Sequence, residues 1–253
     1  MHPQDPAWQR LRNWVGGQAP LLSGPPPGGT GLCVSCRGPA RPGSRRCYAC
    51  YLHRECLPGL LPDVVVPVAY AGKGGPHATN LWRYKSSQAG AGAARDALRT
   101  LLLVFLRDHG PCVWRRAGMT GPTCVAVVPS RRGRPGAHPL QAMIAPYLAL
   151  PWARLSVRYR DDPAARDPDP SRFHAERIPG AAVLLLDDTW TSGASATSAA
   201  AALRLAGARS VAVIVLGRHL DATAAASGGA GFSPASMPFR PWLCAVHGTR
   251  ASQ

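Results

Sequence analysis

Residues 183–195 read Val-Leu-Leu-Leu-Asp-Asp-Thr-Trp-Thr-Ser-Gly-Ala-Ser, and this stretch indicates an α/β fold. Its four consecutive apolar residues are typical of a strand buried inside a parallel sheet. The strand ends at Asp187 and Asp188, and ligands of open α/β sheets bind at the carboxyl ends of the strands. A turn of small residues separates these acids from an alanine-rich helix expected at residues 194–205, which Gly207 ends. The stretch therefore predicts a strand, a ligand-binding turn and a helix.

The turn has the composition of a phosphate-binding loop. Its backbone N–H groups and hydroxyls can point at one phosphate on the positive end of the following helix, and Gly193 lets the backbone approach closely. The two carboxylates stand at a distance suited to the vicinal hydroxyls of a ribose. An N-cap explains one of the acids, but not two acids, four hydroxyls and a glycine together. The predicted ligands of a ribose 5-phosphate are Asp187, Asp188, Thr189, Thr191, Ser192, Gly193, Ala194 and Ser195.

Apolar runs elsewhere predict further strands and helices in alternation, which favours a parallel sheet. Strands are expected at residues 64–70, 125–128, 153–159 and 211–216, and the internal Pro67 predicts an edge position for the first. Helices are expected at residues 91–109, ended by Gly110, and at residues 139–148. Residues 158–177 are polar and proline-rich and predict a loop. That loop, with Arg172 and His174, either closes over the site or is a plain surface loop.

A second turn with phosphate-binding character follows the strand expected at residues 125–128. The sequence there continues Pro-Ser-Arg-Arg-Gly-Arg, so Ser130, Arg131 and Arg132 lie in the turn. Arginine suits bidentate contacts to phosphate. The alternative is an exposed basic turn in an arginine-rich chain.

Four cysteines form two Cys-x2-Cys pairs separated by ten residues. Each pair presents two thiolates from one tight turn, and two such turns complete a tetrahedral shell around a structural Zn2+; its predicted ligands are Cys33, Cys36, Cys47 and Cys50. Disulfides or buried free thiols are the alternative, and a cytoplasmic setting disfavours disulfides. Cys56 is expected to be a bystander, and Cys112 and Cys124 to be core thiols. Cys244 and His247 form a Cys-x2-His pair that could donate to a metal, but the sequence offers no partner pair nearby.

Composition excludes some classes of protein but says less about function than the motifs do. The chain has 253 residues with 46% hydrophobic residues, which excludes wholesale disorder. No apolar run is long enough to cross a membrane, and the first residues lack the pattern of a secretory signal, so a cytoplasmic location is expected. The formal net charge is +16, which favours a polyanionic partner. All basic residues except Lys73 and Lys85 are arginines, however, so the charge also fits the codon bias of a GC-rich genome.

The order of these features resembles the ComF family: a four-cysteine module, Tyr84-Lys85 before a long helix, the Pro-Ser-Arg-Arg turn, and the Asp-Asp turn. Residues 183–195 also resemble the phosphoribosyl-pyrophosphate (PRPP) signature of type I phosphoribosyltransferases, with Trp190 in place of the usual small or aliphatic residue. The resemblance covers residues 30–220. Residues 134–141 depart from the stretch that follows the pyrophosphate loop in many relatives, so the acceptor is not implied.

The resemblance implies an N-terminal segment with the zinc module (residues 1–60) and a phosphoribosyltransferase-like α/β domain (residues 61–253). It implies PRPP bound with Mg2+, pyrophosphate on Arg131, Arg132 and Lys85, and acids that stabilise the reacting C1. The expected function is a phosphoribosyltransferase that transfers, or has lost transfer of, the phosphoribosyl group. The alternative is a non-catalytic accessory protein of competence and DNA uptake that binds single-stranded nucleic acid.

Overall fold

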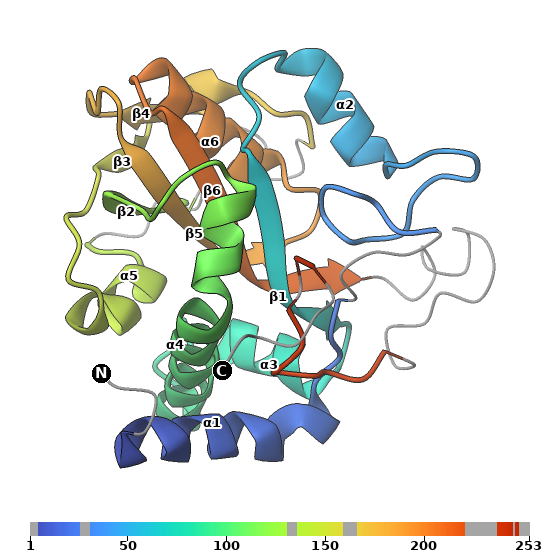
Figure 1. Cartoon of the computed structure of the whole chain (residues 1–253), viewed down its shortest axis with the longest axis vertical. Helices are drawn as coiled ribbons and strands as arrows, with labels where there is room; N and C mark the ends of the chain where they lie inside the picture. Colours follow the sequence, from blue (N-terminus) through green and yellow to red (C-terminus); the bar gives the residue numbers. More distant parts are fainter. Residues whose placement is uncertain are drawn as a thin grey trace.

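A computed structural model describes residues 5–25, 31–130, 136–158, 166–220, 237–244 and 246–247. Its centre is a parallel sheet of four strands in the order β1-β6-β5-β2 (Figure 1). The strands are β1 (Val64–Gly72), β2 (Cys124–Val127), β5 (Ala182–Trp190) and β6 (Ser210–Leu220). The expected α/β class with a parallel sheet flanked by helices is confirmed.

Helices cover both faces of this sheet, and a short antiparallel pair lies beside it. The α-helices are α1 (Pro6–Gln18), α2 (Tyr48–Cys56), α3 (Pro76–Arg83), α4 (Ala91–Arg116), α5 (Pro139–Ile144) and α6 (Ala194–Leu205). Single 3-10 turns cover Ala19–Leu21, Ala145–Tyr147 and Pro170–Arg172. The antiparallel pair is β3 (Leu155–Val157) with β4 (Phe173–Ala175). Among the described residues, no helix has the length and apolar character needed to cross a bilayer.

The alternation of side chains along β5 and β6 builds two cores, one on each face. Leu184, Leu186 and Ile214 pack with α1, α3, α4 and α5 on one face. Val183, Leu185 and Val213 pack with α6 and the cysteine segment on the other. Because successive strand residues face opposite sides, a strand buried on both faces must be apolar throughout. This requirement explains the uninterrupted Val-Leu-Leu-Leu run.

Several expected elements agree with the structure. Helix α6 has the expected bounds, and β1 lies at an edge of the sheet, as Pro67 predicts. The expected end of the long helix at Gly110 is wrong, because α4 continues to Arg116. Gly110 has no Cβ and leaves room for the ring of Trp114, while Val113 is fully buried. Burial of this last segment outweighs the hydrogen bond that Pro111 removes from the helix.

Two segments contain more regular structure than the sequence indicates. Within residues 1–60, α1 begins after Asp5, whose side chain accepts the N–H of Ala7, and it packs against α4 through Trp8. Residues 158–177 are predicted to form a loop, but β4 lies within them. In their described part, Phe173 is buried and the backbone of Asp169 donates to Ser198 Oγ of α6 at 2.7 Å.

Candidate functional site

The turn between β5 and α6 lies beside the carboxyl end of β2. Val127 pairs with Leu186 in the parallel ladder, and the N–H of Val128 donates to the Leu186 carbonyl at 2.9 Å. Ser130 follows two residues later and is partly exposed. The two sequence segments with phosphate-binding character therefore follow the carboxyl ends of two neighbouring parallel strands. Arg131 and Arg132 lie outside the described residues.

Asp188 is held in a buried polar cluster. Its side chain is 8% exposed and accepts the hydroxyl of Tyr84, and Lys85 Nζ lies 2.5 Å from the same oxygen, Oδ2. Tyr84 and Lys85 directly follow α3, which packs against β1 and β6. The structure thus brings Lys85 to the acid pair, while Tyr84 is a site residue whose role the sequence did not suggest.

Asp187 stays partly exposed at the end of β5. Its Oδ1 accepts the backbone N–H of Asp188 at 2.9 Å. Removal from water raises the pKa of Asp187 well above the usual carboxyl range; the adjacent Asp188 raises it further, and Lys85 opposes both. Asp187 therefore holds a proton more readily than an isolated carboxyl.

The turn itself has the geometry of a helix N-terminus. Gly193 has a φ of +86°, in the left-handed region, and α6 begins at the next residue. Thr191 is exposed, while Ser192 and Ser195 are partly exposed; Thr189 is partly exposed at the strand end, and Ala194 is buried. The N–H groups of the first helical turn point toward this loop, where the helix dipole favours an anion.

Trp190 supports the turn from the core side. Its ring is 2% exposed and belongs to the core that α6 and the cysteine segment share. A Cβ at Gly193 would lie 2.1 Å from Trp190 Cζ2, so the indole packs directly against the glycine backbone. The position that the sequence marks as a departure from the PRPP signature is thus a packing contact under the turn.

The four-cysteine cluster has the geometry of a metal site. The four sulfur atoms all lie within 4.8 Å of one another. The Sγ atoms of Cys36 and Cys47 are 3.7 Å apart, close to the edge of about 3.8 Å expected for a tetrahedron with Zn–S bonds of about 2.3 Å. Cys33, Cys36 and Cys50 are buried, whereas Cys56 is exposed and outside the cluster. The cluster could bind a metal such as zinc.

Arg218 connects this cluster with the turn. Its guanidinium Nη1 donates to the carbonyls of Trp190 at 3.1 Å and Thr191 at 2.9 Å. Its Nη2 packs against Gly38, where a Cβ would come within 2.5 Å. Burial lowers the pKa of Arg218, but the thiols, led by that of Cys36, raise it more, and the net shift is upward. A buried cation thus links the cysteines to the backbone of the turn.

Sequence reasoning missed Arg218, although the sequence contains one signal. The arginine follows the apolar run of β6 by two residues, and a charged side chain there is 8% exposed only because it has partners. A second contact also joins the cysteine segment to α6, since His53 Nδ1 lies 3.1 Å from Thr197 Oγ1.

No family model matches the chain, and no curated protein matches it.

Proposed function

We propose that this protein binds PRPP with Mg2+ at the β5–α6 turn and is a phosphoribosyltransferase-like member of the ComF family. The observation that carries the proposal is the position of Asp187 and Asp188, at the end of a parallel strand and one turn before a helix N-terminus. The carboxyl end of β2 lies beside it, and in the sequence this end is followed by Ser130, Arg131 and Arg132, which are assigned to the pyrophosphate.

Each part of the turn has a role in this proposal. The N–H groups and hydroxyls of residues 191–195 hold the 5-phosphate, and the acid pair holds the ribose hydroxyls. Mg2+ bound together with PRPP would supply positive charge to the pyrophosphate. The two carboxylates then stabilise the positive charge that grows on C1 when its bond to pyrophosphate breaks and the electron pair leaves with pyrophosphate.

Lys85 acts as an exchangeable partner of Asp188. Its side chain is 30% exposed, so it can turn from the carboxylate to an arriving pyrophosphate. The exchange leaves Asp188 free to accept a ribose hydroxyl while Tyr84 still orients the carboxylate. One movement of the Lys85 side chain therefore binds the pyrophosphate and frees the Asp188 carboxylate for the ribose.

Calorimetric titration with PRPP and Mg2+ tests this assignment without an acceptor. Asp188→Asn should weaken binding at least about tenfold, since the ribose loses a charged acceptor. Asp96→Asn, at an exposed acid of α4, is the matched control and should bind like the wild type. Absence of PRPP binding by the wild-type chain, or equal binding by both variants, would overturn the proposal.

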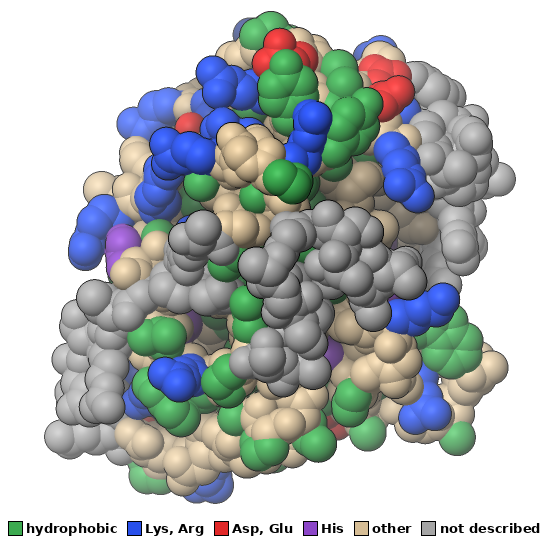
Figure 2. All heavy atoms as spheres, turned by 90° about the vertical axis from the view of Figure 1, so that its right-hand side faces the viewer, with side chains coloured by type: hydrophobic (Ala, Val, Ile, Leu, Met, Phe, Trp, Pro, Cys, Tyr) green, Lys and Arg blue, Asp and Glu red, His purple; other side chains and the backbone are tan. Residues whose placement is uncertain are grey.

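A specific surface feature favours a second candidate, binding of single-stranded nucleic acid. Tyr48 and Tyr51 are exposed on α2, and Arg41 lies over the Tyr48 ring at 5.9 Å. Lys and Arg side chains are spread over the face shown in Figure 2. Exposed aromatic rings beside cations provide stacking and phosphate contacts for unpaired bases.

Fluorescence anisotropy with a labelled oligothymidine distinguishes the two candidates. Nucleic-acid binding predicts an affinity that falls steeply with salt and weakens in Tyr48→Ala. Retained PRPP binding in Tyr48→Ala would show that the two surfaces are separate. An affinity for the oligonucleotide that is independent of salt would argue against this second candidate.

A further inference from the structure

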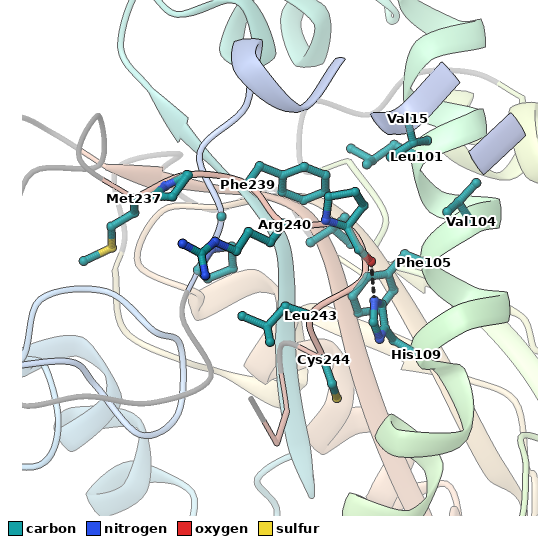
Figure 3. Close-up of a pocket in the computed structure, with 15 residues that line it drawn as sticks. Val15, Leu101, Val104, Phe105, His109, Met237, Phe239, Arg240, Leu243 and Cys244 are labelled. Carbon is teal, nitrogen blue, oxygen red and sulfur yellow. Dashed lines mark hydrogen bonds between the residues drawn. The ribbon is translucent and has the colours of Figure 1, made fainter. Parts of the chain in front are cut away.

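The C-terminal segment returns to α4 far from the β5–α6 turn in sequence. Phe239 is buried in the core that contains α1 and α4. His109 of α4 donates from Nε2 to the Pro241 carbonyl at 2.7 Å, drawn as the dashed line in Figure 3. Figure 3 also shows His109 extending toward the segment that carries Leu243 and Cys244. Two parts of the chain that are 132 residues apart therefore meet at His109.

This meeting point gathers metal-ligating side chains. The ligand atoms of Cys112, Cys244 and His247 all lie within 4.8 Å of one another. Cys244 Sγ is 3.5 Å from His247 Nδ1 and accepts the N–H of Val246 at 3.4 Å. Such N–H···S contacts stabilise a thiolate, which is the form that binds metals.

His109 supplies an independent sign of a missing partner. Its side chain is 3% exposed, and Nδ1 has no hydrogen-bond partner among the described residues. Because the Nε2–H group donates a hydrogen bond to the Pro241 carbonyl, the lone pair of the neutral ring lies on the buried Nδ1. A histidine that donates one ring N–H to a backbone carbonyl and offers the other nitrogen is typical of metal sites.

We propose that Cys112, Cys244 and His247 bind a zinc ion distinct from that of the four-cysteine cluster, beside the buried ring of His109. His109 and Cys112 are one helical turn apart on α4, and Cys244 and His247 have the same spacing in the C-terminal segment. Two sulfur atoms and one imidazole nitrogen form a mixed donor set that suits zinc, with one coordination position left for water or another donor.

Such an ion would fasten the end of the chain to α4. It would also fix one wall of the cavity of about 250 Å³ in Figure 3, which is lined by Phe105, His109, Phe239 and Cys244 among others. The inference is independent of the proposed PRPP site, because none of the residues named for it contributes to the β5–α6 turn.

Metal content of the full chain tests this inference. The reduced protein is dialysed against a micromolar excess of zinc, freed of unbound zinc and measured by mass spectrometry of the metal. The zinc content of Cys244→Ser should be one ion lower than that of the wild type. The same loss is expected for His247→Ala, where the replaced side chain is exposed. Cys56→Ser and His174→Ala, at an exposed cysteine and an exposed histidine outside both clusters, should keep the wild-type content.

Cobalt(II) provides a second readout that does not depend on zinc occupancy. Wild-type protein should take up an additional equivalent of cobalt, and the ligand-field bands of that equivalent should be missing in His247→Ala. A Cys33→Ser variant should retain those bands, since the proposed site is separate. Equal zinc content and equal cobalt spectra in the wild type and Cys244→Ser would overturn the proposal.

Discussion

Gly193 combines a left-handed backbone with a tryptophan ring packed against its Cα. An L side chain at a φ of +86° is strained by about 1–2 kcal/mol. A methyl group there would also lie inside the van der Waals envelope of Trp190 and force repacking at about 1–3 kcal/mol. The shape of the turn thus depends on this residue as much as on the two acids before it.

Gly193→Ala should accordingly lower the free energy of unfolding by about 2–4 kcal/mol in urea denaturation. Gly16→Ala is the matched control, because Gly16 is inside α1 and a Cβ there meets nothing within 4 Å. That control should stabilise the protein by about 0.5–1 kcal/mol. Equal effects of the two substitutions would contradict the packing contact.

The raised pKa of Asp187 predicts how stability varies with pH. Between the ordinary carboxyl pKa and the raised folded value, the folded chain retains a proton that the unfolded chain has lost. The free energy of unfolding therefore decreases as pH rises through this window. In a series of urea titrations over the same pH range, the free energy of unfolding of Asp187→Asn should decrease less than that of the wild type. The dependence of this free energy on pH should be unchanged in Asp96→Asn.

At the scale of elements, β6 connects the cysteine cluster with the β5–α6 turn through the side chain of Arg218. Arg218 leaves the end of this strand and donates to two carbonyls of the turn, while its other side contacts Gly38. The hydrogen bonds to the Trp190 and Thr191 carbonyls therefore come from a side chain of a neighbouring strand. The turn is held by its own strand and helix and also by β6.

Arg218→Met should remove these donors and lower the free energy of unfolding by about 2–4 kcal/mol, since buried acceptors are left unpaired. Arg209→Met, at the exposed arginine just before β6, should change it by less than about 0.5 kcal/mol. Denaturant midpoints at constant slope measure both effects. A stability of Arg218→Met equal to that of Arg209→Met would show that water replaces the guanidinium.

Local elements were predictable where the sequence alone determines them. The β5–turn–α6 unit follows from an apolar run, a glycine and an alanine-rich helix that are contiguous. The first Cys-x2-Cys pair lies in a turn as predicted, whereas the second lies at the start of α2, with Cys47 as the N-cap and Cys50 in the first helical turn. The contacts of Arg218, and that of Tyr84 with Asp188, join residues far apart in the sequence, so no local pattern encodes them. Likewise, α4 passes Gly110 because burial of Val113 by tertiary packing overrides local propensity.

At the scale of the whole molecule, the cysteine segment and the α/β core form one packed unit. Cys33, Cys36 and Cys50 share a core with Val183, Leu185 and α6. His53 of α2 contacts Thr197 of α6, and Arg218 contacts both parts. A metal bound by the cluster would therefore be coupled to the β5–α6 turn through Arg218.

Loss of the cluster should weaken the proposed ligand site without touching it. We expect Cys36→Ser to reduce PRPP affinity by about three- to tenfold, because Arg218 loses the charge that fixes its position. Cys56→Ser, at the exposed cysteine outside the cluster, should retain wild-type affinity. Calorimetry on both variants measures the difference, and unchanged affinity in Cys36→Ser would show that the turn is independent of the cluster.

The pairing of Lys85 with Asp188 has a practical consequence for following occupancy in solution. The chain contains two lysines, and the other, Lys73, is exposed on the surface. An acylating reagent thus has two side-chain targets, of which one serves as an internal standard and the other reports from beside the acids. The ratio of acylation at Lys85 to that at Lys73, read by peptide mass mapping, follows ligand exchange at the carboxylate directly and needs no knowledge of the acceptor.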